Sequence, residues 1–163
     1  MTETYLLQLL NLFEDNDIEI HVDGGWGVDA LLGEQTREHE DLDIAVQRKD
    51  AAKLRKLLEG KGYKNVLRND TSDYNFVLGD EQGHLVDVHV YEFDENGKNI
   101  YGIEYPHDSL AGTGTIGGHP VKCIAAEWVV KFHSGYDLKE KDYHDVKLLC
   151  EKFNIPLPEK YKK

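Results

Sequence analysis

The order of the predicted helices and strands indicates an α+β fold: a small mixed sheet with flanking helices and a short C-terminal helical segment. Two observations carry this prediction. Apolar residues recur at helical spacing near both ends of the chain, and runs rich in β-branched and aromatic residues fill its middle. The 163 residues, 40% of them hydrophobic, suffice for one domain with a packed core. We expect a single domain over residues 1–163, with its main body in about 1–123 and the helical segment in about 124–163.

Helices and strands alternate over the first part of the chain. Apolar residues recur at helical spacing in residues 4–14 and again in 49–60, which predicts two amphipathic helices. Between them, residues 18–22 alternate apolar and polar side chains, and LDIAV at 42–46 is a second strand. Two glycines separate the first strand from a short apolar helix, which we expect to end at Gly33.

The middle of the chain is typical of antiparallel sheet. Residues 63–67, 74–78 and 85–91 are rich in strand-forming side chains, and GDEQG makes a turn between the last two. Residues 92–112 are polar, and we expect them to be irregular. The glycine pair within 113–123 predicts a hairpin.

The C-terminal part is predicted to be helical. Residues 125–133 form one short helix and residues 142–153 a second, with apolar side chains at helical spacing. Pro156 and Pro158 then end the helical pattern, because proline cannot continue a helix.

The charge balance excludes some classes of partner. Lys and Arg number 19 against 31 Asp and Glu, a formal net charge of −12, which disfavours nucleic acid and anionic membranes. It suits a cationic substrate or a carboxylate-rich metal site. The apolar runs are far shorter than the roughly 18 residues of a membrane span, and the start of the chain has no signal-peptide pattern. The two cysteines are too few for a disulfide framework, so we expect a cytoplasmic globular protein.

Three aspartates are candidate metal ligands and catalytic groups. Asp41 and Asp43 lie two apart at the start of a predicted strand, so both carboxylates project from the same face. Asp87 lies inside VDVHV, where a charge is costly unless it is paired, exposed or bound to a metal. The alternative is a solvated polar face, which antiparallel sheets allow. Three carboxylates on one face suit two metal ions on a triphosphate.

Four residues before the second strand are candidates for binding an anion. Gly24 and Gly25 join a strand to a helix, where backbone N–H groups and the helix dipole favour negative charge. Arg37 and His39 precede the aspartate pair, and Arg is suited to bidentate phosphate contacts. The alternatives are an ordinary tight turn, and side chains that are exposed or paired with the neighbouring glutamates.

Candidate substrate-binding residues come from two segments. His89 shares the face of the aspartate in its strand, and Tyr91 follows in the same strand. Residues 133–145 are dense in polar and aromatic groups, including Tyr136 and Asp137. That segment could form a wall of the substrate pocket, or it could simply connect two helices with Asp137 as an N-cap.

Residues 24–44 resemble the small antibiotic nucleotidyltransferases of the DNA polymerase β-like superfamily. The shared features are the glycine turn, a short helix ending in glycine, and the run from Thr36 to Asp43 that matches T-R-x-H-x-D-[IL]-D. The third carboxylate falls within VDVHV. FHSGYDL at 132–138, followed by Asp145, is similar to lincosamide nucleotidyltransferases in particular. The usual G-S turn is G-G here, which leaves backbone amides at the phosphate site.

The resemblance implies a polymerase β-like nucleotidyltransferase fold with its catalytic core in about 1–123. It implies transfer of AMP from ATP to a hydroxyl of a lincosamide antibiotic, with release of pyrophosphate and antibiotic resistance as the result. Asp41, Asp43 and Asp87 would hold two Mg²⁺ ions, and Asp87 could also accept the hydroxyl proton. The glycine pair, Arg37 and His39 would hold the triphosphate.

Two other functions stay open. The acceptor could be an aminoglycoside, modified at its 2″ position, or another small molecule. The domain could also bind nucleotide without catalysis, although all three aspartates are present. The expected partners are the antibiotic and the nucleoside triphosphate, with no nucleic acid and no membrane, and the small domain makes a homodimer plausible. The sequence does not choose between ATP and GTP.

Overall fold

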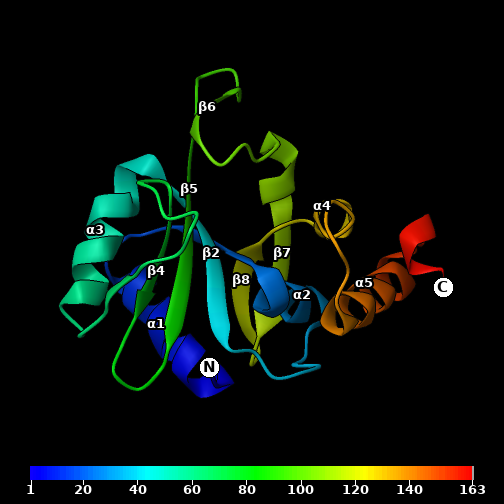
Figure 1. Ribbon diagram of the computed structural model, residues 1–163, viewed down its shortest axis with the longest axis horizontal. Coiled ribbons are helices and arrows are strands. Elements are labelled where there is room, and N and C mark those ends of the chain that lie inside the picture. Colours follow the sequence, from blue (N-terminus) through cyan, green and yellow to red (C-terminus); the bar gives the residue numbers. More distant parts are fainter. Residues whose placement is uncertain (163) are drawn as a thin grey trace.

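The computed structural model describes residues 1–162 and has the α+β fold that the sequence predicts (Figure 1). The helices are α1 (Glu3–Asp15), α2 (Gly24–Leu32), α3 (Arg48–Glu59), α4 (Ala126–Phe132) and α5 (Glu140–Phe153), with short 3₁₀ helices at His107–Ala111 and Glu159–Tyr161. The strands are β1 (Ile20–Asp23), β2 (Asp41–Gln47), β3 (Lys64–Val66), β4 (Asn75–Gly79), β5 (Leu85–Phe93), β6 (Asn99–Gly102), β7 (Gly112–Ile116) and β8 (His119–Cys123).

The strands form one mixed sheet in the order β3-β4-β5-β2-β1-β8-β7, and β6 pairs with the far end of β5. The central pair β2 and β5 is parallel, as is the pair β1 and β8, whereas the other neighbours are antiparallel. The parallel pairing of β2 and β5 aligns Asp43 with Asp87. The two faces of this pair differ, because the valines of VDVHV are buried on one face and the polar side chains lie on the other.

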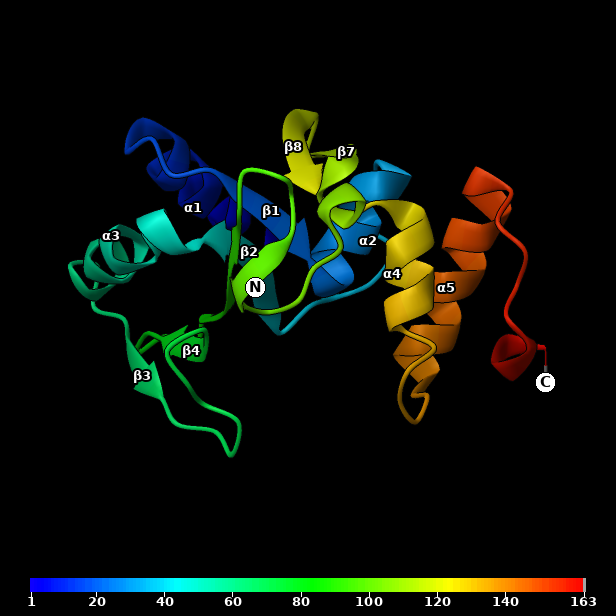
Figure 2. The same ribbon diagram turned by 90° about the horizontal axis from the view of Figure 1, so that it is seen from above.

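The α2 helix and the C-terminal helices form a unit beside the sheet. Gly33 ends α2 in the left-handed conformation, with φ at 82°, as the sequence predicts. Figure 2 shows α4 and α5 side by side next to α2, at the end of the molecule opposite β3 and α3. One hydrophobic cluster runs from Leu6 in α1 to Tyr161 near the C-terminus, so both parts share a core.

The expectation that residues 92–112 are irregular is wrong. This segment contains β6 and a 3₁₀ helix, and β5 continues to Phe93. Asp94 accepts hydrogen bonds from the backbone N–H groups of Asn96 and Lys98, so a tight turn brings the chain back to pair with β5. Polar composition hid this strand, because its pairing depends on a turn rather than on apolar alternation.

The alternative reading of Asp137 as an N-cap is also wrong. The α5 helix begins at Glu140, and Asp142 in its first turn accepts a hydrogen bond from the backbone N–H of Lys139. The helix ends before the prolines, at Asn154 in the left-handed conformation. None of the helices within residues 1–162 is long and apolar enough to cross a membrane.

Candidate active site

Asp43, Asp87 and His89 gather on the polar face of the central strands. A carboxylate oxygen of Asp43 lies 3.8 Å from Nε2 of His89, and one of Asp87 lies 3.7 Å from the same nitrogen. One potential ligand atom of each residue lies within 4.8 Å of the others. Asp41 shares the face but is aligned with Leu85, one side-chain repeat or about 7 Å further out. The predicted common face is therefore present, with two of the three aspartates in direct proximity.

The cluster carries excess negative charge that a cation would offset. Burial raises the pKa of Asp87 to about 6, with the charges of Asp43 and Asp41 adding to this rise and His89 opposing it. Burial opposes protonation of His89, but contacts with Asp43 and Asp87 outweigh it and raise its pKa. Burial, followed by the charge of Asp43, raises the pKa of Asp41, and the Lys141 ammonium acts in the opposite direction. Paired carboxylate oxygens are the donors that Mg²⁺ prefers, so these residues fit that ion.

Gly24 leaves space for the carboxylate of Asp43. Its φ is +58°, and a Cβ added there would lie 2.1 Å from Oδ2 of Asp43. Asp23 fixes this turn, because Oδ1 of Asp23 accepts a hydrogen bond from the Gly24 N–H at 2.8 Å. The buried Tyr105 hydroxyl donates to Oδ2 of Asp23 at 2.9 Å. The glycine is needed here because any side chain would collide with the carboxylate.

Sequence reasoning missed Asp23 and Tyr105. Asp23 is a fourth carboxylate on the same face, aligned with Asp43 across β1 and β2. Its position at the end of a strand, just before the glycine pair, could have identified it as a site residue. Tyr105 offered none, because it lies in the segment expected to be irregular. Burial, followed by the charge of Asp23 and the hydrogen bond to it, raises the pKa of Tyr105 well above its ordinary value. The phenol therefore stays protonated as a donor.

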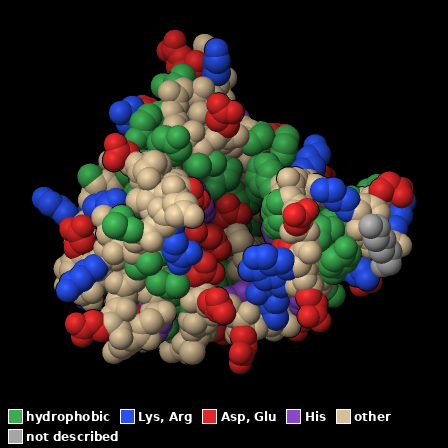
Figure 3. All heavy atoms as spheres, viewed as in Figure 1, with side chains coloured by type: hydrophobic (Ala, Val, Ile, Leu, Met, Phe, Trp, Pro, Cys, Tyr) green, Lys and Arg blue, Asp and Glu red, His purple; other side chains and the backbone are tan. Residues whose placement is uncertain are grey.

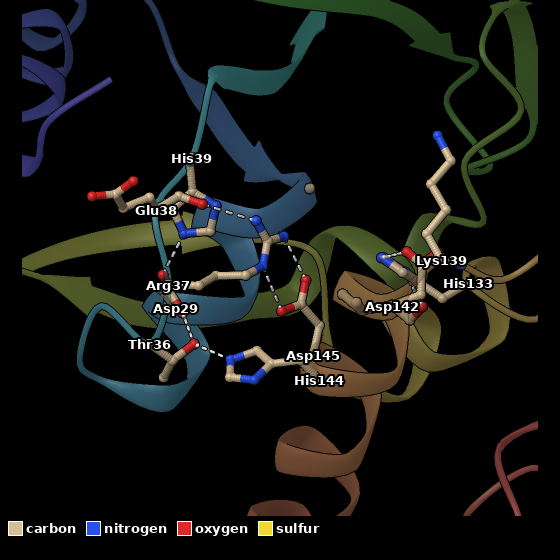
Figure 4. Close-up of polar contacts among 12 residues, drawn as sticks. Asp29, Thr36, Arg37, Glu38, His39, His133, Lys139, Asp142, His144 and Asp145 are labelled. Carbon is tan, nitrogen blue, oxygen red and sulfur yellow. Dashed lines mark hydrogen bonds and ion pairs between the residues drawn. The ribbon is translucent and has the colours of Figure 1, made fainter. Parts of the chain in front are cut away.

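Arg37 and His39 lie against the start of α2. A Cβ on Gly25 would lie 2.4 Å from Nδ1 of His39 and 2.6 Å from Nη2 of Arg37, so this glycine allows their close approach. Both side chains have partners of their own (Figure 4). His39 Nε2 contacts Oδ2 of the buried Asp29. Arg37 donates from Nε and Nη2 to the two carboxylate oxygens of Asp145, at 2.9 and 2.7 Å.

These contacts connect α5 to the loop that precedes β2. Thr36 donates to Oδ1 of Asp29 at 2.7 Å, and Nε2 of His144 lies 3.0 Å from the same hydroxyl oxygen (Figure 4). Arg37 thus pairs across 108 residues with Asp145 rather than with the neighbouring glutamates. A local sequence pattern indicates only neighbours in the chain as partners for this arginine, so it could not identify Asp145.

The two parts border a cleft of about 590 Å³. Figure 3 shows acidic side chains gathered in a hollow between the part that carries β4 and β5 and the part that carries α4 and α5. The sheet and the loop before β2 contribute Arg37, His39, Asp41 and Asp43 to its lining, and the start of α2 contributes the glycine pair. The C-terminal segment contributes His133, Tyr136, Lys141 and Asp142.

The predicted substrate residues divide into two groups. Tyr136 lines the cleft and donates to Asp142 at 3.0 Å, and His89 lies beside the carboxylates. Tyr91 is only 4% exposed, borders another cavity, and packs its ring edge-on against Tyr105. Asp137 is exposed and is not among the residues that line the cleft. The structure therefore does not bring Tyr91 and Asp137 to the carboxylates.

A mixed sheet with aspartates aligned on adjacent central strands, beside a glycine turn that begins a helix, is the arrangement of a polymerase β-like nucleotidyltransferase. The comparisons agree with this class. Residues 5–149 match the family model described as aminoglycoside-2″-adenylyltransferase, and the chain belongs to that family. The predicted fold and the predicted resemblance to small antibiotic nucleotidyltransferases are confirmed, and the protein is a nucleotidyltransferase.

Two curated relatives and two solved structures illustrate the similarity. A lincosamide resistance protein of Staphylococcus haemolyticus is 36% identical over 155 residues, which cover 91% of this chain and 94% of the relative. A 2″-aminoglycoside nucleotidyltransferase of Klebsiella pneumoniae is 29% identical over 131 residues, 78% of this chain and 70% of the relative.

Among solved structures, a lincosamide antibiotic adenylyltransferase with lincomycin bound superposes with a TM-score of 0.80 and 32% identity, covering 96% of this chain and 99% of that one. An aminoglycoside enzyme in complex with adenylyl-2″-tobramycin has a TM-score of 0.75 at 22% identity, with coverages of 93% and 88%. The second of these similarities concerns the fold alone.

Proposed function

We propose that the protein transfers AMP from ATP to a hydroxyl of a lincosamide antibiotic such as lincomycin or clindamycin, releases pyrophosphate, and thereby confers resistance. The observation that carries this proposal is similarity over the full length of lincosamide enzymes. The chain matches 94% of the lincosamide relative at 36% identity and 99% of the lincomycin-bound enzyme, but only 70% of the aminoglycoside relative.

The chemistry is a single displacement at phosphorus. The acceptor hydroxyl oxygen attacks the α-phosphorus of ATP, the bond to the oxygen bridging the α- and β-phosphates breaks, and pyrophosphate leaves with that electron pair. Asp43 and Asp87, with Asp41, are the residues that would hold two Mg²⁺ ions, which would neutralise phosphate charge and lower the pKa of the acceptor hydroxyl. Asp87 is mostly ionised at neutral pH, because its pKa is about 6, and it is the proposed acceptor for the hydroxyl proton.

Positioning supplies the remaining catalysis. Gly24 and Gly25 place the start of α2 beside the aspartates, and we propose that this end of the helix, with Arg37 and His39, borders the triphosphate. Tyr136 and His89 are the proposed contacts to the antibiotic. For Tyr91 and Asp137, the predicted contact requires a part of the antibiotic that reaches beyond the cleft.

An aminoglycoside acceptor is the second candidate. The matching family model and the relatives that modify the 2″ position support it. Both antibiotic classes carry basic amines, and the net charge of −12 suits either class. Charge therefore does not separate the two candidates, and full-length similarity favours the lincosamide.

We also propose that the protein acts in the cytoplasm as a single catalytic domain, without nucleic acid or a membrane. Free thiols at Cys123 and Cys150 are consistent with a reducing compartment. A homodimer would help to enclose an antibiotic that one small domain covers only in part.

A substrate panel tests the proposal. The protein would be incubated with ATP, Mg²⁺ and either lincomycin, clindamycin, kanamycin, gentamicin or tobramycin, and the products analysed by mass spectrometry. We expect a mass gain of one AMP on the lincosamides, with a higher kcat/KM than on any aminoglycoside. An adduct on aminoglycosides alone would transfer the assignment to the second candidate, and no adduct on any of the five would reject both.

A further inference from the structure

The cleft contains many more acidic than basic side chains. Its lining includes Asp23, Glu38, Glu40, Asp41, Asp43 and Asp142, whereas Arg37 and Lys141 are the cleft-lining Lys and Arg residues within the part of the chain that the structure describes. A nucleoside triphosphate carries several negative charges of its own. Apart from metal ions and the backbone amides at the start of α2, these two cations are the candidates to offset the phosphate charge.

Arg37 is already neutralised. Asp145 accepts two hydrogen bonds from its guanidinium, and the Asp145 side chain is only 2% exposed. The third guanidinium nitrogen, Nη1, donates to the backbone oxygen of Glu38. Moving Arg37 onto a phosphate would leave a buried carboxylate without its partner, which is strongly unfavourable. The positive charge of Arg37 is therefore committed to α5.

Lys141 is in the opposite situation. It lies in the first turn of α5, is exposed, and lines the cleft. Within residues 1–162, the ammonium group of Lys141 makes no hydrogen bond or ion pair with another side chain or with the backbone. Asp41, at the outer end of the aspartate row, lines the same cleft. Asp41 is one side-chain repeat, about 7 Å, outward from the aligned Asp43 and Asp87.

We propose that Lys141 binds the β- and γ-phosphates of the nucleotide, the part that leaves as pyrophosphate, and that Arg37 is a positioning residue that holds α5 in place for it. The proposal rests on the proposed nucleotidyl transfer. If the α-phosphate reacts at Asp43 and Asp87, the next two phosphates extend toward Asp41, which lines the cleft together with Lys141. The C-terminal segment thus supplies phosphate contacts as well as a wall for the antibiotic.

A binding series without turnover tests this assignment. Calorimetry in Mg²⁺ would compare AMP, ADP and a triphosphate whose α,β-bridging oxygen is replaced by methylene, on the wild type, K141Q and K141R. Loss of a charge-assisted contact predicts at least about tenfold weaker triphosphate binding by K141Q, an intermediate loss for ADP and less than about twofold for AMP. K141R should recover most of the affinity. K147Q, an exposed lysine on the same helix, is the control and should bind like wild type.

Two results would overturn the proposal for Lys141. One is triphosphate affinity unchanged in K141Q, and the other is an equal loss for AMP and triphosphate. In both cases the wild type still binds nucleotide, so the proposed nucleotidyl transfer survives. A wild type that binds none of the three nucleotides would reject that function as well.

A double-mutant cycle tests the positioning role of Arg37. If Arg37 acts through Lys141, R37Q weakens triphosphate binding in the wild-type background but adds little in the K141Q background. A purely structural role would instead weaken AMP as much as triphosphate. Additive, triphosphate-specific losses would mean that Arg37 contacts the phosphates itself, and would contradict the positioning assignment.

Discussion

The two sides of the cleft are built in different ways. On the sheet side, strand register places the functional groups, since the parallel pairing of β2 and β5 aligns Asp43 with Asp87. On the α5 side, side-chain contacts place them, since the Arg37–Asp145 pair and the contact between Thr36 and His144 hold that helix. Strand register therefore fixes the positions of Asp43 and Asp87, whereas on the other side these polar contacts add to the packing of α5 in the shared core.

The largest expected effect is on the sheet side. Asp43→Asn and Asp87→Asn each remove a negative charge from the proposed metal site without changing side-chain size. We expect each to lower kcat at least about 10³-fold, about 4 kcal/mol of transition-state stabilisation, while thermal unfolding stays near wild type. Pyrophosphate release measures the rate, and Asp15→Asn at the exposed end of α1 is the control. A loss below about tenfold in either variant would remove that residue from the reacting centre.

Gly24→Ala tests how tightly the sheet side holds Asp43. The new methyl group would need the space 2.1 Å from Oδ2 of Asp43, so the carboxylate must move. A shift of about 1 Å in a catalytic group can cost about 10²-fold in rate. Gly62→Ala is a matched control, because Gly62 also has a positive φ, +91°, but has no atom within 4 Å of the added Cβ. Both variants should lose about 1–2 kcal/mol of stability, and only Gly24→Ala should lose activity. Equal activities of the two variants would show that Gly24 does not determine the position of the Asp43 carboxylate.

Asp145→Ala tests the α5 side. It removes the carboxylate that holds Arg37, and we expect a loss of about 1–3 kcal/mol in the free energy of unfolding, together with a raised KM for ATP. Urea unfolding and initial rates give the two quantities. Glu92→Ala breaks the exposed ion pair between Arg48, whose side chain is 55% exposed, and Glu92, whose side chain is 39% exposed. It should lower the free energy of unfolding by less than about 0.5 kcal/mol. Equal costs for the two pairs would show that burial does not distinguish them.

The smallest effect is expected from Tyr105→Phe. It removes one hydrogen bond to Asp23 and leaves the ring in place. Because Asp23 still accepts from Gly24, we expect a rate loss of up to about tenfold, about 1.4 kcal/mol. Tyr143→Phe alters a partly buried tyrosine of α5 whose ring packs edge-on against Tyr161, and it should leave the rate unchanged. A rate for Tyr105→Phe equal to that control would assign Tyr105 to packing alone.

The same comparison explains what the sequence could predict. Alternation along a strand places Asp41 and Asp43 on one face, and the glycine turn and the end of α2 at Gly33 follow from local conformational preferences. Such features depend on neighbours in the chain. The pairing of Arg37 with Asp145 spans 108 residues, and no local pattern specifies it. Tyr105 and β6 were missed because a polar turn, rather than apolar periodicity, brings that segment onto the sheet.

The central claim is that the aligned aspartates of β2 and β5 act together in binding the metal ions. Electron paramagnetic resonance of Mn²⁺, as a substitute for Mg²⁺, would measure it directly in the presence of the methylene triphosphate analogue. We expect bound Mn²⁺ in the wild type and a loss of affinity of at least about tenfold in both Asp43→Asn and Asp87→Asn. Mn²⁺ binding at wild-type affinity in both variants would contradict the account.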